Sequence, residues 1–208
     1  QKSLQDNEII PFIAVGLLLF QIGIFSQAIA LIVFLFVLSV GFINCYNFMD
    51  GINGITGLYS LVVLGGFIMI NEKEQIIETN LIGYIILSIA VFGYYNFRKK
   101  AMLFAGDVGS ISWAMVVLFL GLSFSIKLNA PVILLLVSVY LVDSGLTILY
   151  RVYLKENIMQ PHSYHIYQKL VDVLKWSHLK VSGAYALLQF LIAMIVYIFS
   201  GYQCFNVL

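Results

Sequence analysis

Charged residues and cysteines are scarce in this chain. Of its 208 residues, 10% are charged and 62% are hydrophobic, and the mean hydropathy is +0.99. A soluble domain carries roughly 25% charged residues. This composition therefore excludes a soluble domain and predicts an integral membrane protein. The two cysteines, Cys45 and Cys204, form no metal or redox pattern. The net charge of +1 by itself identifies no partner, and we expect no nucleic acid among the partners.

Linkers, low-complexity stretches and internal repeats are also lacking, and apolar segments make up most of the chain. Seven of these segments, each of about 16–21 residues, approach the length that crosses a bilayer. We therefore predict an all-α fold, a polytopic transmembrane helical bundle that forms one membrane domain over residues 1–208. The predicted spans lie near residues 9–25, 28–44, 55–70, 80–96, 111–126, 130–150 and 182–200.

Lysine and arginine are distributed unevenly between the two sides that seven spans would define. Nine of the eleven lie on the side that holds the N-terminus and the loops 44–54, 97–110 and 151–181. The other two, Lys73 and Lys127, lie on the opposite side. Because positively charged loops stay in the cytosol, the first side is predicted to be cytoplasmic. The three polar clusters of the chain fall in these same loops, which predicts one shared site facing the cytosol.

The first polar cluster, residues 44–54, combines amides, one acid and two glycines. Asn47, Asp50 and Gly54 are three and four residues apart and would share one face of a helix. The glycines allow a tight backbone and the close approach of a ligand. Asp50 and Asn53 could instead only cap the following helix. Three amides and an acid are more than a cap needs, so we interpret the cluster as a binding site.

The second polar cluster, residues 104–110, reads Phe-Ala-Gly-Asp-Val-Gly-Ser and precedes an apolar segment. A carboxylate such as Asp107 is costly in a membrane protein unless it binds something. Magnesium prefers oxygen ligands and is often held jointly by one carboxylate and by substrate phosphates. A glycine-containing loop before a helix can also present backbone N–H groups to phosphate. The cluster therefore favours a magnesium–phosphate site, and a helix capped by Asp107 or Ser110 is the alternative.

The third polar cluster, residues 161–168, holds two of the three histidines, His162 and His165. They are three residues apart and could face one ligand, but zinc would need further ligands that are not well placed nearby. Contact with a phosphate or a sugar is the functional interpretation, and a surface histidine pair is the alternative. Residues 164–179 place apolar side chains at helical spacing and predict an amphipathic helix lying on the membrane.

Asp143 lies alone inside the sixth predicted span, where an acidic residue is expensive and is commonly functional. One interpretation is a hydrogen-bonded structural acid that pairs with Arg151. The other is a residue that lines the site. The sequence leaves both open.

Together these residues resemble a known family, the bacterial polyprenyl-phosphate N-acetylhexosamine-1-phosphate transferases of the glycosyltransferase 4 group. Three motifs match in order over roughly residues 30–200. They are Asn44-x-x-Asn47-x-x-Asp50-Gly51-x-x-Gly54, Phe104-x-Gly106-Asp107-x-Gly109-Ser110 and Pro161-His162-x-x-His165. Asp143 and Arg151 are similar to an acid and a base that precede the histidine loop in the family.

The resemblance implies that a lipid phosphate, undecaprenyl phosphate, attacks the β-phosphorus of a UDP-N-acetylhexosamine. The products would be a lipid-diphosphate-sugar and UMP, and the reaction would begin the synthesis of a cell-envelope polysaccharide. It also implies dependence on Mg²⁺, with Mn²⁺ as the alternative ion, and a site on the cytoplasmic face of the bacterial inner membrane. The resemblance leaves room for a homodimer.

The resemblance further implies roles for individual residues. Asp107 would be a magnesium ligand, and Phe104 would stack on the uracil ring. The implied catalytic residues are Asp50, Asp107, His162 and His165. The implied substrate-binding residues are Asn44, Asn47, Gly51, Asn53 and Phe104.

The chain departs from the family pattern at several points. Asn53 stands where the family usually has Asp, and Ser163 stands where relatives often have Arg. The single Pro-His-x-x-His differs from the triple-histidine run of the branch that uses a MurNAc-pentapeptide donor. An adjacent Asp-Asp pair is lacking, and seven spans are fewer than the family has. Because the chain also starts at Gln1 without a signal peptide's basic region, we expect either processing or the C-terminal part of a longer protein.

Two other functions compete with a transferase. An intramembrane acid such as Asp143 would suit an ion-coupled transporter or channel. Transporters, however, place their polar groups near the midplane on broken helices, whereas these clusters are predicted at one surface. The missing Asp-Asp pair would suit a truncated, non-catalytic membrane partner.

Overall fold

The computed structural model describes residues 2–157, 160 and 163–200, and these residues contain helices and no strand. The all-α prediction is therefore confirmed for this part of the chain. The helices are α1 (Lys2–Gln21), the 3₁₀ helix η1 (Ile24–Ser26), α2 (Ile29–Phe48), α3 (Ile55–Glu74), α4 (Thr79–Asn96), α5 (Gly106–Lys127), the 3₁₀ helix η2 (Pro131–Val137), α6 (Ser138–Tyr153), α7 (Ile166–Asp172) and α8 (His178–Ser200).

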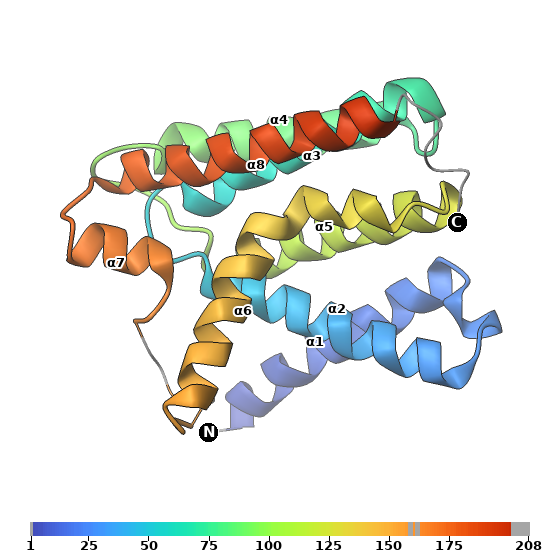
Figure 1. Ribbon diagram of the computed structural model, residues 1–208, viewed down its shortest axis with the longest axis horizontal. Helices are drawn as coiled ribbons and strands as arrows, with labels where there is room; N and C mark the ends of the chain where they lie inside the picture. The colour runs from blue at the N-terminus through green and yellow to red at the C-terminus, as the bar shows by residue number, and fades with distance from the viewer. Residues whose placement is uncertain (1, 158–159, 161–162, 201–208) are drawn as a thin grey trace.

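The long helices run back and forth, so that the loops alternate between the two ends of the bundle (Figure 1). Helix α3 packs against α4 and α8, and α2 packs against α1 and α5. The loops 49–54 and 97–105 and the segment that carries α7 lie at one end. This arrangement brings together the parts of the chain that hold the polar clusters.

Five helices of the described chain are long and apolar enough to cross a membrane, and the predicted number of seven is not confirmed. The five are Ile29–Phe48, Ile55–Glu74, Gly106–Lys127, Pro131–Tyr153 and His178–Phe199. Within the residues whose side chains are described, α1 contributes the shorter apolar stretch Pro11–Gln21. Helix α4 is not among the five and has Thr79, Asn80 and Asn96 at its ends.

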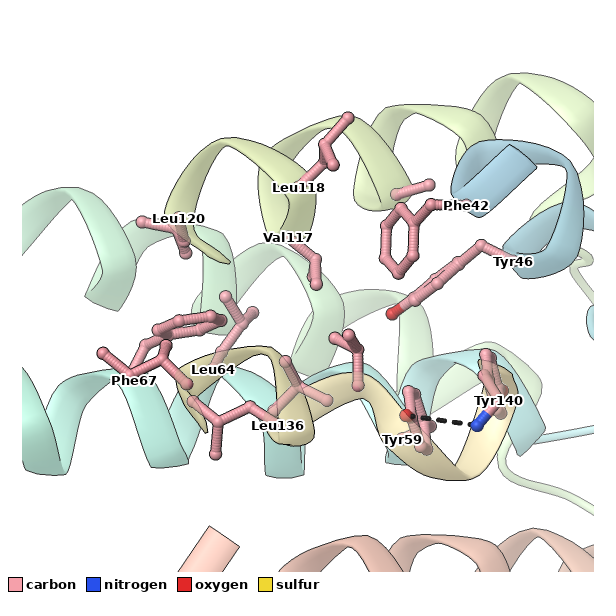
Figure 2. Packing of buried hydrophobic residues seen from close by; sticks show 14 of the residues in the cluster. Phe42, Tyr46, Tyr59, Leu64, Phe67, Val117, Leu118, Leu120, Leu136 and Tyr140 are labelled. Carbon is pink, nitrogen blue, oxygen red and sulfur yellow. Dashed lines mark hydrogen bonds between the residues drawn. The ribbon is translucent and has the colours of Figure 1, made fainter. Parts of the chain in front are cut away.

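The core lies where α2, α3, α5 and the η2–α6 segment meet, as Figure 2 shows. Tyr59 of α3 and Tyr140 of α6 stack with ring centroids 3.6 Å apart, and Tyr46 of α2 contacts both rings at their edges. All three tyrosine side chains are fully buried. The stack joins three helices directly beneath the loop that contains Asp50.

The predicted span 130–150 is divided into a 3₁₀ helix and an α-helix that runs at an angle to the bundle (Figure 1). Such a break frees backbone groups, and these must find partners inside a membrane protein. Gln189 of α8 supplies them. Its Nε2 donates to the Leu135 carbonyl at 3.1 Å, and its Oε1 accepts from the Val139 N–H at 3.2 Å. The Tyr59 hydroxyl donates to the same Oε1 at 2.9 Å and holds Gln189 in place.

The side chain of Phe97, an aromatic wedge, determines the path of the chain after α4. The ring of Phe97 lies in a slot between α3 and α4, against Gly57 and Gly93. A Cβ atom on Gly57 would lie 2.6 Å from this ring, and one on Gly93 would collide with it as well. Both positions therefore require glycine, and the wedge fixes the start of the loop that leads to Asp107.

Candidate active site

The structure brings the first two polar clusters together. Ser110 of α5 donates from Oγ to Asn47 Oδ1 of α2 at 2.5 Å. On the same side, the Gly106 N–H faces the Asp50 carboxylate. The last turn of α2 and the first turn of α5 therefore form the walls of one site.

Part of the segment predicted as a glycine-rich loop is the first turn of α5. The helix begins at Gly106, whose φ of +59° is a conformation that other residues rarely adopt. Asp107 follows in the first helical turn and is exposed. An acidic residue is favourable there because the N-terminal end of a helix carries partial positive charge. That charge also favours phosphate binding at the same place.

Asp50 is half-buried between α2 and α3. Burial raises the pKa of the Asp50 carboxyl above its ordinary value, and the nearby Asp107 carboxylate adds to the rise. The Thr56 hydroxyl and the Gly106 N–H oppose it. The Asp107 carboxylate is near enough to disfavour ionisation of Asp50, and a cation near both acids would relieve this repulsion.

The donor set allows one kind of metal site. Within residues 2–157, 160 and 163–200, no three or more histidine, cysteine, aspartate or glutamate side chains gather around a point. Asp50 and Asp107 offer the hard oxygen atoms that Mg²⁺ prefers, and Mg²⁺ commonly takes one or two carboxylates together with substrate phosphates and water. The two acids therefore fit a Mg²⁺ ion held jointly with a phosphate rather than an all-protein cage.

Asn96, which no sequence pattern singles out, joins the two loops of the site. It is buried at the end of α4. Its Oδ1 accepts from the Gly54 N–H at 2.7 Å, and its Nδ2 donates to the Leu103 carbonyl at 2.7 Å. In the sequence, Asn96 is only an amide at the end of an apolar segment, which is typical of any helix end.

Replacing Asn96 with alanine should destabilise the protein, because it removes both hydrogen bonds and leaves the buried Gly54 N–H without its partner. A buried group left unpaired costs about 1–3 kcal/mol, so we expect a loss of that size and a clearly lower Tm. The matched control is Asn80→Ala, since Asn80 is exposed and bonds only to Glu78. Equal Tm values for the two variants would show that Asn96 does not hold the loops together.

Asn53 is buried, with 6% of its surface exposed. Its Nδ2 donates to the carbonyls of Arg98 at 3.0 Å and Lys99 at 3.3 Å. Its own carbonyl accepts from the Ser182 hydroxyl at 2.8 Å. Asn53 therefore holds the loop that begins at Arg98 in place. Its contact with substrate stays a prediction.

The remaining predicted substrate-binding residues lie at the surface. Phe104 is 66% exposed at the rim of the site, where its ring is accessible to a planar base. Asn44 is exposed on α2. Gly51 is exposed as well, and the Tyr167 hydroxyl lies directly against it.

The third cluster is described in part, because Pro161 and His162 lie outside the described residues. His165 is 3% exposed and precedes α7 as its N-cap residue. Its N–H donates to Gln168 Oε1 at 3.1 Å, and its Nδ1 lies 3.4 Å from Asp143 Oδ1. The alternative of a surface histidine pair is therefore wrong for His165.

Asp143 is a buried, hydrogen-bonded acid, but the predicted pairing with Arg151 is wrong. Besides facing His165, Asp143 accepts the Ile166 N–H at 2.9 Å and the Tyr185 hydroxyl at 2.6 Å. Arg151 lies eight residues further along α6, about 12 Å away along the helix axis. There its Nε pairs with Glu156 at 3.3 Å.

The amphipathic helix predicted over 164–179 is shorter than expected. Helix α7 covers Ile166–Asp172, and Lys175 then adopts a positive φ of 55° that ends any helical continuation. The burial of Tyr167 shows that one face of α7 packs against the rest of the protein. Val173 and Leu174 are exposed beyond its end and remain available to a membrane surface.

Comparisons with known proteins identify the family of the chain. Residues 8–125 match the sequence model of glycosyl transferase family 4, a range that includes Asp50 and Asp107. A probable undecaprenyl-phosphate N-acetylglucosaminyl 1-phosphate transferase of Bacillus subtilis is 30% identical over 137 residues, 64% of this chain and 38% of that protein. A phospho-N-acetylmuramoyl-pentapeptide-transferase of Streptococcus thermophilus is 30% identical over 146 residues, 69% of this chain and 40% of that protein. The chain spans about two-fifths of the length of these relatives.

Proposed function

Because the chain belongs to glycosyl transferase family 4, we propose that it carries part of the active site of a sugar-1-phosphate transferase. The acceptor is a polyprenyl phosphate, undecaprenyl phosphate, and the donor is a UDP-N-acetylhexosamine. The products are a lipid-diphosphate-sugar and UMP. The observation that carries the proposal is the contact between the end of α2 and the start of α5, which brings the segments of Asp50 and Asp107 together at one end of a bundle of apolar helices, within the region that matches the family.

The choice of donor rests on the sequence of the histidine loop. A single Pro-His-x-x-His stands where the branch that uses a MurNAc-pentapeptide donor has a triple-histidine run. The Bacillus subtilis relative is named for N-acetylglucosamine, and the Streptococcus thermophilus relative is named for the muramoyl-pentapeptide. We therefore favour the simple N-acetylhexosamine, and the muramoyl-pentapeptide donor is the second one to assay.

In the proposed reaction the protein mainly positions groups and stabilises charge. The N–H groups at the start of α5 bind phosphate oxygens, Phe104 stacks on uracil, and Asn47, oriented by Ser110, contacts the nucleotide sugar. Asp107 would hold Mg²⁺, with Asp50 beside it. When bound, the ion neutralises charge on the diphosphate and favours the departure of UMP. The lipid phosphate attacks the β-phosphorus, and the bond that it forms there replaces the bond to UMP, which leaves.

Topology provides a prediction that does not depend on activity. The end of the bundle with the site carries most of the lysine and arginine, so we propose that it faces the cytosol of a bacterial inner membrane. We expect a single cysteine introduced by Ser163→Cys in a Cys45→Ser, Cys204→Ser background to react with an impermeant reagent only from the cytosolic side. A Gln27→Cys variant in that background is the matched control and should react only from outside. Labelling of the Ser163→Cys variant only from outside would contradict the orientation.

Ligand-induced stabilisation tests the proposed function against transport. We expect the full-length protein to gain thermal stability when UMP and Mg²⁺ are added together, and less with either alone, because each completes the other's site. Substrate-dependent flux through vesicles without such a gain would instead support a transporter. The position of the polar clusters at one end of the bundle, rather than near its middle, favours the transferase.

A further inference from the structure

Tyr167 of α7 is attached to the turn that holds Asp50. Its side chain is buried, and its hydroxyl donates to the Phe48 carbonyl at 3.1 Å. Phe48 is the last residue of α2. The hydrogen bond therefore ties α7 to the chain two residues before Asp50.

The same tyrosine explains why position 51 is glycine. A Cβ atom on Gly51 would collide with the Tyr167 hydroxyl and would lie 2.9 Å from Cζ of the same ring. No other group lies closer to that position. The Tyr167 side chain thus contacts the backbone immediately after Asp50, at Gly51. With its hydrogen bond to Phe48, it contacts the chain on both sides of the acid.

The other end of this connection is Asp143. This buried carboxylate accepts the first N–H of α7, that of Ile166, and the Tyr185 hydroxyl of α8. His165 and Thr147 also face it, each at 3.4 Å. One acid of α6 therefore seats the start of α7 and joins it to α8, although Asp143 itself does not contact the Asp50 turn.

From these contacts we propose that Tyr167 and Asp143 are positioning residues of the transferase site. Asp143 seats α7, and Tyr167 transmits that position to the turn of Asp50. Neither residue needs to touch substrate. The inference rests on the proposed function for its catalytic effect, but the mechanical link between α7 and the turn stands on the structure and can be measured without activity.

Tyr167→Phe keeps the ring and removes only the hydrogen bond to Phe48. The loss of one ordinary hydrogen bond should lower kcat/KM by roughly 3- to 10-fold, with little change in Tm. The loss should appear mainly in KM for the nucleotide sugar. Amide hydrogen exchange in residues 48–54 should accelerate, while exchange in the loop 75–78 at the opposite end should not. Tyr153→Phe, at an exposed tyrosine of α6, is the matched control and should change neither.

Two further variants test the connection itself. Gly51→Ala should impair activity more than Tyr167→Phe, and part of that loss should be recovered in the double variant, because the collision with the hydroxyl is gone. Asp143→Asn should accelerate exchange both in α7 and in residues 48–54. The inference would be overturned if the activity losses of Gly51→Ala and Tyr167→Phe simply added in the double variant and amide exchange in residues 48–54 stayed unchanged in every variant. Absence of transfer with any donor, with the exchange changes intact, would instead count against the proposed function alone.

Discussion

Asp107→Asn is expected to abolish most UMP release from the full-length protein while leaving its insertion and thermal stability intact. Asparagine keeps the shape of the side chain but lacks the charge that a Mg²⁺ ion requires. Metal assistance stabilises transition-state charge by several kcal/mol, which corresponds to a roughly 10²–10³-fold lower rate. Stability should change little, because Asp107 is exposed and its favourable position at a helix start is worth only about 0.3–1 kcal/mol.

The control for this experiment is Asp172→Asn. Asp172 is an exposed acid at the end of α7, on the same end of the bundle, and it lies outside the proposed site. The control should release UMP at nearly the original rate. Near-normal turnover by the Asp107→Asn variant would remove Asp107 from the list of metal ligands.

Asp50→Asn should lower activity by a similar factor but make the fold slightly more stable at neutral pH. The pKa of Asp50 is raised by burial and by Asp107, so the folded protein holds this proton more tightly than the unfolded chain. Ionisation of Asp50 therefore lowers the free energy of unfolding as pH rises through the folded-state pKa. Asparagine does not ionise, so the variant avoids that loss.

The pH dependence of Tm separates this effect from a general change in stability. The variant and the original protein should have similar Tm values at acidic pH, where Asp50 is protonated. Above the raised pKa of Asp50, the variant should have the higher Tm. A variant that is less stable than the original protein at neutral pH would contradict this prediction. It would show that groups in the folded protein stabilise the ionised form of Asp50. Full activity in the variant would exclude Asp50 from the site.

Much of the arrangement of the polar residues could be predicted because its signals are local. Asn47, Asp50 and Asp107 stand out as polar residues between apolar segments, and the lysine and arginine count places their loops on one side. The apolar segments themselves indicate helices at nearly the right positions. These predictions need only composition and spacing, which the sequence contains in full.

The rest depends on contacts between residues far apart in the chain. The break between η2 and α6 is set by Gln189 of a different helix, while the segment itself reads as one apolar span. The structural role of Asn96 depends on two loops meeting around it. Asp143 has Arg151 as an obvious partner by sequence, but its nearest groups come from α7 and α8.

The length of the chain limits which parts of the site it can hold. Its relatives are more than twice as long as the region they share with it. Two carboxylates suffice for a Mg²⁺ ion bound together with phosphate, and further acids would strengthen the site. Activity should therefore be measured on the full-length protein.

Product formation by the purified full-length protein tests the central claim most directly. The protein would be incubated with a UDP-N-acetylhexosamine, undecaprenyl phosphate and Mg²⁺, and mass spectrometry would follow UMP and the lipid product. We predict equal amounts of UMP and lipid-diphosphate-sugar, and neither product when the lipid or the ion is omitted. Release of UDP in place of UMP, or no product with either an N-acetylhexosamine or a muramoyl-pentapeptide donor, would contradict the account.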